Sequence, residues 1–206
     1  MLSFGLFYYW ISWLIWIIVT FFMKTKKTQQ LLIISILILI IVANKYYTVG
    51  HFQISTAYSL ILFGSWMMFR ILKRHHYHLM ISFTIMIGYS GITIWKNATP
   101  LWLFFPDLLF IPIFCSLIIF MLTKGLAARL LTVILGLCTG ELFSSFIFTS
   151  YDMYQIIGDF HFLDQLSVTI LFILFIHFMQ QLIYLSYQFL NEYRGNSSSN
   201  IKLMKG

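Results

Sequence analysis

The sequence has very little charge for its length. Only 9% of its 206 residues are charged, whereas 60% are hydrophobic. A soluble domain usually carries about 25% charged residues. A soluble core of this size could not bury so many Leu, Ile and Phe side chains, and the apolar runs are too long for buried strands. The composition therefore excludes an ordinary soluble domain and indicates that the solvent of this protein is the lipid bilayer.

The sequence also lacks the motifs of common enzymes and metal sites. It contains no Walker A loop, no HExxH and no GxSxG. Cys115 and Cys138 lie inside apolar runs, form no CxxC and have no zinc spacing, so we expect them to pack as small apolar residues. These absences favour a protein that is not an enzyme and that holds no metal and no cofactor.

The sequence does contain seven apolar segments separated by short polar loops. A transmembrane helix needs about 20 residues. The second segment, residues 31–43, is only 13 residues long, so we expect it to extend over Gln29, Gln30, Tyr46 and Tyr47. The predicted fold class is therefore all-α, a polytopic transmembrane helix bundle. The predicted spans are residues 4–22, 31–43, 54–68, 79–95, a stretch within 101–122, 126–150 and 166–190.

No linker is long enough to separate two domains. Residues 1–190 are expected to form a single transmembrane helical domain, and residues 191–206 a polar cytoplasmic tail. Positive charges stay on the cytoplasmic side of a membrane because their transfer is costly. Three alternate loops and the C-terminal tail together carry eleven of the Lys and Arg residues, and the opposite side carries only Lys45 and Lys96. This bias predicts an odd number of spans, with the N-terminus outside and the C-terminus in the cytoplasm.

The cationic loops also predict the contacts with lipid. The formal net charge is +7, but no nucleic-acid-binding motif accompanies it. Anionic headgroups on the cytoplasmic side are therefore the expected partner, and nucleic acid is not. The residues expected to contact these headgroups are Lys24, Lys26, Lys27, Arg70, Lys73 and Arg74.

Two ionisable residues fall well inside predicted spans. Glu141 lies in the middle of the sixth, and an ionised carboxylate there is costly unless it is neutral, paired or facing water. His177 lies near the middle of the seventh, with Gln181, Tyr184 and Gln188 on the same helical face. The two residues lie at similar depths, so a Glu141–His177 pair is allowed. Their roles stay open between hydrogen bonding that packs helices and the coupling of protons or ions.

Asp107 is the third candidate, in the stretch "PDLLFIP". Pro106 suits the first turn of a helix, where a missing N–H costs nothing, and an acid there complements the helix dipole. The favoured interpretation is that Asp107 begins a helix near the outer interface. The alternative is a functional carboxylate inside the membrane, which would make Asp107, Glu141 and His177 one intramembrane polar cluster.

Small residues recur every fourth position along the sixth span. Such a row forms a groove that another helix can approach closely. The pattern predicts tight packing within the bundle, with a homodimer seam as the alternative. The groove residues are Ala128, Thr132, Gly136, Gly140 and Ser144.

The opening "FYYWISWLIWIIVTFFMKTKK", the small size and the seven-span layout resemble the YphA-like family of small integral membrane proteins of spore-forming Gram-positive bacteria. The resemblance implies a multi-pass cell-membrane protein and supplies no catalytic residues.

Two functions follow from these observations. The first is a non-enzymatic accessory or partner-binding component of the plasma membrane, with other membrane proteins as its partners. The alternative is a small ion- or proton-coupled secondary transporter that uses Glu141 and His177. An enzyme that acts on lipid ranks lowest.

Overall fold

A computed structural model describes residues 5–22, 26–50, 52–70, 72, 75–98, 107–151, 153 and 155–203. At residues 22, 27, 28, 98, 107 and 189–203 the description covers the backbone alone. The described residues form seven helices and three short strands. The helices are α1 (Leu6–Phe22), α2 (Lys26–Val42), α3 (Thr56–Phe69), α4 (His75–Ala98), α5 (Asp107–Leu122), α6 (Leu126–Thr149) and α7 (Phe160–Leu203).

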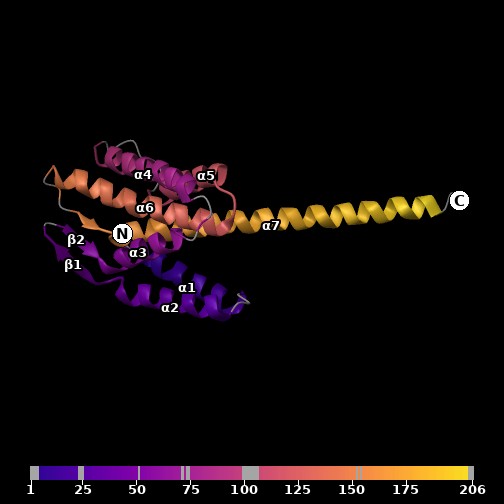
Figure 1. Ribbon diagram of the computed structural model, residues 1–206, viewed down its shortest axis with the longest axis horizontal. Helices are drawn as coiled ribbons and strands as arrows, with labels where there is room; N and C mark the ends of the chain where they lie inside the picture. The colour runs from indigo at the N-terminus through magenta and orange to yellow at the C-terminus, as the bar shows by residue number, and fades with distance from the viewer. Residues whose placement is uncertain are drawn as a thin grey trace.

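The helices form a bundle with a small sheet at one end (Figure 1). Helix α6 runs between α4 and α5 on one side and α1, α2 and α3 on the other. Helix α7 starts at the sheet end and extends far beyond the other helices. The backbone of α7 stays helical through residues 191–203, which the sequence assigns to the tail.

Three helices are long and apolar enough to cross a membrane by themselves. Their apolar parts are His75–Asn97, Leu126–Thr149 and Phe160–Gln188. The other four helices, which are also apolar, have 14 to 17 residues. At about 1.5 Å per residue, 17 residues cover roughly 26 Å, slightly less than the ~30 Å hydrocarbon core. These shorter helices can reach both interfaces only with help from the residues that flank them.

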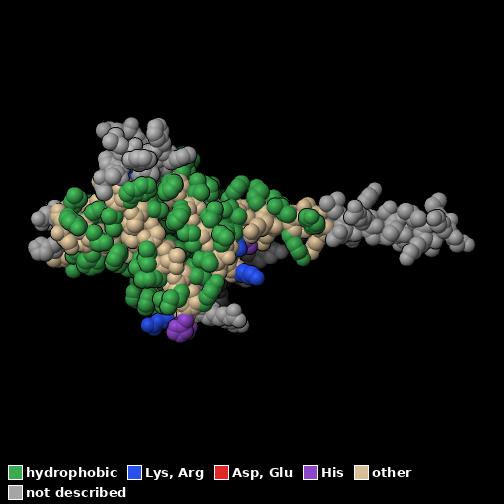
Figure 2. Space-filling model, turned by 90° about the horizontal axis from the view of Figure 1, so that it is seen from above, with side chains coloured by type: hydrophobic (Ala, Val, Ile, Leu, Met, Phe, Trp, Pro, Cys, Tyr) green, Lys and Arg blue, Asp and Glu red, His purple; other side chains and the backbone are tan. Residues whose placement is uncertain are grey.

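The outer surface of the bundle is mainly apolar, as a membrane protein requires. Figure 2 shows hydrophobic side chains over most of the drawn face, and no Asp or Glu side chain of the described residues is visible there. Large side chains such as Trp10 at 71% and Met121 at 80% are exposed. Water would oppose such a surface, whereas lipid tails are its natural solvent.

The three strands correct the prediction of an all-α fold. Strands β1 (Tyr46–Val49) and β2 (Phe52–Ser55) form an antiparallel hairpin, and β3 (Ile156–Ile157) pairs with β2 in parallel. The turn passes through Gly50, at φ 62°. Such a positive φ suits a residue without a Cβ.

The same hairpin corrects two predicted boundaries. Tyr46 and Tyr47 belong to β1 and do not extend α2, and Ile54 belongs to β2 and not to α3. Aromatic and β-branched residues favour extended backbone, which explains these strands. Thr56 then ties the hairpin to α2, because its hydroxyl donates to the carbonyls of Val42 and Lys45 at 2.8 Å.

Helix α4 packs into the row of small residues on α6. A Cβ added to Gly136 would lie 2.8 Å from the Cβ of Ile85 and 2.9 Å from the carbonyl oxygen of Ser82. A Cβ added to Gly140 would lie 2.9 Å from Cδ1 of Tyr89. Thr132 and Ser144 are buried along the same row, and Ala128 is half-buried. In this structure the neighbour in the groove is therefore a helix of the same chain.

Candidate functional site

Glu141 lies among buried polar groups in the half of the bundle nearest the sheet. Its side chain is 8% exposed. The hydroxyl of Tyr89 donates to Oε2 of Glu141 at 2.7 Å and lies 3.4 Å from Oε1 of Gln165. The backbone N–H of Gly158 also lies close to the carboxyl group. We call Tyr89, Glu141, Gly158 and Gln165 the buried polar cluster.

Close helix packing brings the cluster together. Because Gly140 has no side chain, the ring of Tyr89 can lie against α6 one residue before Glu141. The same ring packs edge-on against Phe162 of α7, with ring centroids 6.2 Å apart. Helices α4, α6 and α7 therefore meet around the carboxyl group of Glu141. The hydrogen bonds that this carboxyl group accepts offset the cost of burying it.

Gly158 closes the cluster from the side of the sheet. It follows β3 with φ +70°, and a Cβ on it would lie 2.3 Å from the Cβ of Tyr58. Tyr58 is itself fixed, because its hydroxyl donates to the carbonyl of Cys138 at 2.6 Å. Only a glycine lets the backbone pass this close to Tyr58 and bring an N–H group to Glu141.

His177 does not belong to the buried polar cluster. On α7, His177 comes twelve positions after Gln165, which is about 18 Å along the helix axis. Its ring nitrogen Nε2 lies 3.4 Å from Nε2 of Gln181, one turn further along the same helix. The structure therefore does not pair Glu141 with His177, although residue counts alone placed them at similar depths.

The side chain of Asp107 lies outside the described residues, but its backbone does not. Asp107 is the first described residue of α5 and Pro106 lies outside the described residues, so the start of a helix at Asp107 stays a prediction. Of the residues expected to contact lipid headgroups, Lys26 and Arg70 are exposed. The side chains of Lys24, Lys27, Lys73 and Arg74 lie outside the described residues.

Asp159 and Asp164, which lie between the predicted sixth and seventh spans, each cap a helix. Helix α7 begins six residues before the predicted span. Asp159 therefore accepts a hydrogen bond from the backbone N–H of Phe162 at 2.8 Å and caps α7. Asp164 lies within α7 and accepts from the N–H groups of Gly5 at 2.8 Å and Tyr8 at 2.7 Å. It therefore caps α1, at the opposite end of the sequence.

The local sequence carries a signal for only one of these caps. Asp159 stands just before an apolar run, which is a recognisable helix start. Asp164 and the α1 terminus are 156 or more residues apart, and no local pattern predicts such a contact.

Asp159 also lies near β1. Burial raises the pKa of the Tyr46 phenol, and the charge of Asp159 raises it further. Among the described residues, no group of three or more His, Cys, Asp or Glu could hold a metal ion.

Two substitutions of Glu141 test whether its hydrogen bonds or its charge matter. Glu141→Gln retains an oxygen that accepts from Tyr89, so we expect the free energy of unfolding to change by less than about 1 kcal/mol. Glu141→Leu leaves the Tyr89 hydroxyl without this acceptor and should cost about 1–3 kcal/mol. Unfolding in mild detergent, followed by circular dichroism, measures both. Equal losses in the two variants would contradict a role that depends on the hydrogen bond.

Comparison with known proteins places the chain in a family. No solved structure matches it. The chain is 22% identical over 163 residues to the uncharacterized protein YphA of Bacillus subtilis (strain 168), an alignment that covers 78% of this chain and 81% of that protein. The family model for YphA-like integral membrane proteins matches residues 4–199. This match confirms the resemblance seen in the sequence, and the chain belongs to the YphA-like integral membrane protein family.

Proposed function

We propose that this chain is a non-enzymatic, multi-pass component of the cell membrane that acts by binding another membrane protein. The observation that carries the proposal is the extension of α7 beyond the bundle (Figure 1). Helix α7 has 44 residues, or about 66 Å, roughly twice the thickness of the hydrocarbon core. One helix thus reaches well past the membrane-embedded part of the molecule.

The exposed part of α7 offers side chains suited to a protein partner. From residue 178 to residue 188 every side chain is exposed. Tyr184 and Tyr187 are 64% and 66% exposed, beside Ile183 at 59%. Tyrosine is enriched in protein interfaces because its ring buries a large area while its hydroxyl finds a hydrogen-bond partner. This stretch of α7 is our proposed binding segment.

The proposed orientation places the end of the binding segment, where the apolar stretch Phe160–Gln188 ends, at the cytoplasmic face of the membrane. The cations Lys26, Arg70 and Lys124 come from helix ends directed away from the sheet, the end from which α7 projects. Lys45, which lies on the opposite side in the charge count, is next to β1 of the sheet. Positive charge near a membrane favours the cytoplasmic side, which supports an external N-terminus and a cytoplasmic C-terminus.

The geometry of Glu141 favours this function over transport. A transporter needs its ionisable groups to meet substrate or water at a shared depth. Here Glu141 is buried among hydrogen-bond donors, and His177 lies about 18 Å further along α7 than the nearest cluster residue. Purified Glu141→Gln in proteoliposomes should therefore give the same pH-dependent proton and cation fluxes as the wild type. A flux that the wild type carries and this variant lacks would overturn the proposal in favour of transport.

Site-specific photo-crosslinking in living cells tests the binding segment. We expect a photoreactive amino acid at Tyr184 or Tyr187 to give a discrete crosslinked protein band. The control is Phe63 on α3, which is 65% exposed but lies on the part of the bundle that faces lipid. Crosslinks of equal yield at all three positions, or none at Tyr184 and Tyr187, would contradict the proposal.

The same positions allow a control for orientation. The native residues Cys115 and Cys138 are buried, so they should not react with a bulky thiol reagent. A cysteine at position 187 should react with a membrane-impermeant maleimide only after the cells are opened. Labelling in intact cells would place α7 outside and overturn the proposed orientation, whatever the crosslinking result.

A further inference from the structure

Arg129 is a buried cation at the end of the bundle from which α7 projects. Its side chain is only 8% exposed. The guanidinium carbon lies 3.9 Å from the ring centroid of Phe120 on α5. Nε donates to the carbonyl of Thr123 at 2.8 Å, and one terminal nitrogen donates to Oε1 of Gln180 on α7 at 3.3 Å. Three elements therefore hold the guanidinium in one place.

None of these partners balances the charge of Arg129. A carbonyl, an amide and an aromatic ring are neutral, and among the described residues no carboxylate contacts this side chain. The guanidinium has further N–H groups with no hydrogen-bond acceptor in this part of the chain. Arg is almost never buried without a charged partner. The position therefore leaves a positive charge that an anion from outside the described chain could neutralise.

The first turn of α6 adds to the positive potential at the same place. Because Nε reaches the carbonyl of Thr123, the Arg129 side chain folds back over the start of its own helix. Helix α6 begins after Gly125, with no side-chain cap and no acidic residue in its first turn. Its first N–H groups and the positive end of its dipole are therefore available to an anion. The exposed Lys124 lies one residue before Gly125.

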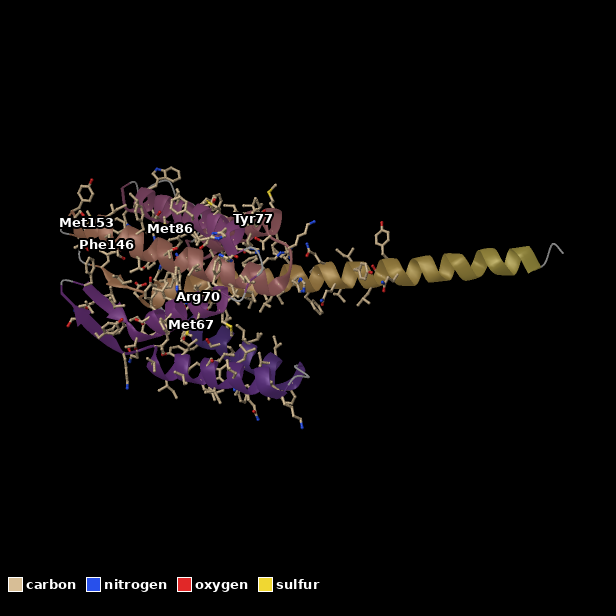
Figure 3. The ribbon with its side chains drawn as sticks, in the orientation of Figure 1. Met67, Arg70, Tyr77, Met86, Phe146 and Met153 are labelled. Carbon is tan, nitrogen blue, oxygen red and sulfur yellow. The ribbon has the colours of Figure 1, made fainter. Side chains whose placement is uncertain are left out.

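The turn between α5 and α6 also contains a hydroxyl group that is free to donate a hydrogen bond. The hydroxyl of Thr123, a residue that is 1% exposed, has no hydrogen-bond partner. At the same end of the bundle the hydroxyl of Tyr77 donates to the carbonyl of Leu122 at 2.8 Å and ties α4 to the end of α5 (Figure 3). Contacts made by α4, α5 and α7 therefore hold the surroundings of Arg129 in position.

The start of α6 also lies at the level of the lipid headgroups. Helix α6 has 24 residues, or about 36 Å, slightly more than the ~30 Å hydrocarbon core. Its two ends therefore reach the headgroup layers. Phosphate is the anion abundant at this depth, and it suits both a planar guanidinium and a helix N-terminus.

We propose that Arg129 and the first turn of α6 form a binding site for the phosphate group of a phospholipid headgroup. Phosphate oxygens accept from the free N–H groups of Arg129 and from the backbone N–H groups of α6. Gln180 and Phe120 hold the guanidinium in position. The site is distinct from the exposed cations expected to attract headgroups without specificity, and it does not depend on which side of the membrane α6 begins.

Lipid binding to the full-length protein tests this site. The probe is dihexanoyl phosphatidylglycerol, titrated into protein in mild detergent and followed by native mass spectrometry. We expect Arg129→Gln and Ala127→Asp each to weaken binding about tenfold or more, since each removes or opposes a charge-assisted contact. Lys45→Gln, which removes an exposed cation next to β1 at the other end of the bundle, is the matched control and should leave the affinity unchanged.

Ala127→Asp separates a binding defect from a folding defect. Ala127 is exposed in the first turn of α6, where an acid complements the helix dipole. This variant should melt at the wild-type temperature or above it while it repels phosphate. Wild-type affinity in Ala127→Asp, or equal retention of a diacylglycerol without phosphate, would overturn the proposal. Inorganic phosphate that displaces the lipid at equal concentration would assign the site to free phosphate and overturn the lipid headgroup as its ligand.

Discussion

Gly158→Ala is expected to destabilise the protein by about 2–4 kcal/mol, the combined cost of a left-handed backbone and an overpacked core. Gly158 has φ +70°, which L side chains rarely adopt. A Cβ there would overlap Tyr58, at 2.3 Å from its Cβ and 2.5 Å from its Cγ. Tyr58 cannot move easily, because its hydroxyl is bonded to α6. Unfolding in mild detergent, followed by circular dichroism, gives the measurement.

Gly50→Ala is the matched control for this prediction. Gly50 has φ +62°, close to that of Gly158, but nothing lies within 4 Å of an added Cβ. Gly50→Ala should therefore lower the free energy of unfolding only by the cost of the left-handed backbone, about 1–2 kcal/mol. The difference between the two variants measures the contact of Gly158 with Tyr58. Equal losses would mean that the chain at residue 158 does not pass against Tyr58 as the structure has it.

Gly136→Ala should cost about 1–3 kcal/mol, because the added methyl group would separate α6 from α4. It would lie 2.8 Å from Cβ of Ile85 and 2.9 Å from a backbone oxygen of α4, and the backbone cannot rotate out of the way as a side chain can. The separation should also lengthen the hydrogen bond between Tyr89 and Glu141, since Gly140 and Glu141 follow on the same helix. The same unfolding assay measures this loss.

Gly91→Ala, on α4, is the control, and we expect it to change the stability in the opposite direction to Gly136→Ala. Gly91 lies within α4, and nothing lies within 4 Å of a Cβ added to it. Because alanine favours a helix over glycine, Gly91→Ala should stabilise the protein by about 0.5–1 kcal/mol. A loss of stability in Gly91→Ala similar to that in Gly136→Ala would show that close helix packing is not what Gly136 provides.

The helices of this fold can be predicted from the sequence because a single property determines them. Each apolar run must satisfy its own backbone hydrogen bonds in lipid, and a helix does so within one segment. The row of small residues on α6 can be found for a similar reason, since its period of four is a local pattern that needs no knowledge of the partner. The local pattern does not predict which helix packs into the row, so the partner, α4, could not be identified from the sequence.

The sheet and the surroundings of Glu141 depend on contacts between distant segments. Strands β1 and β2 have four residues each and β3 has two, so their aromatic and aliphatic side chains look like the ends of apolar spans. Tyr89 and Glu141 are 52 residues apart, and only the rotation of each helix about its axis decides that they meet. Counting residues estimates the depth of a side chain but not the direction in which it points, and for that reason His177 looked like a partner of Glu141.

The cap that Asp164 provides has a consequence for the order in which the protein is made. Helix α1 leaves the ribosome before α7 does, and the carboxylate that accepts from Gly5 and Tyr8 is made 156 or more residues later. Until translation reaches α7, these amides must remain with water or lipid headgroups. Helix α1 is therefore synthesised early but capped late, so that two segments far apart in the sequence complete this part of the fold together.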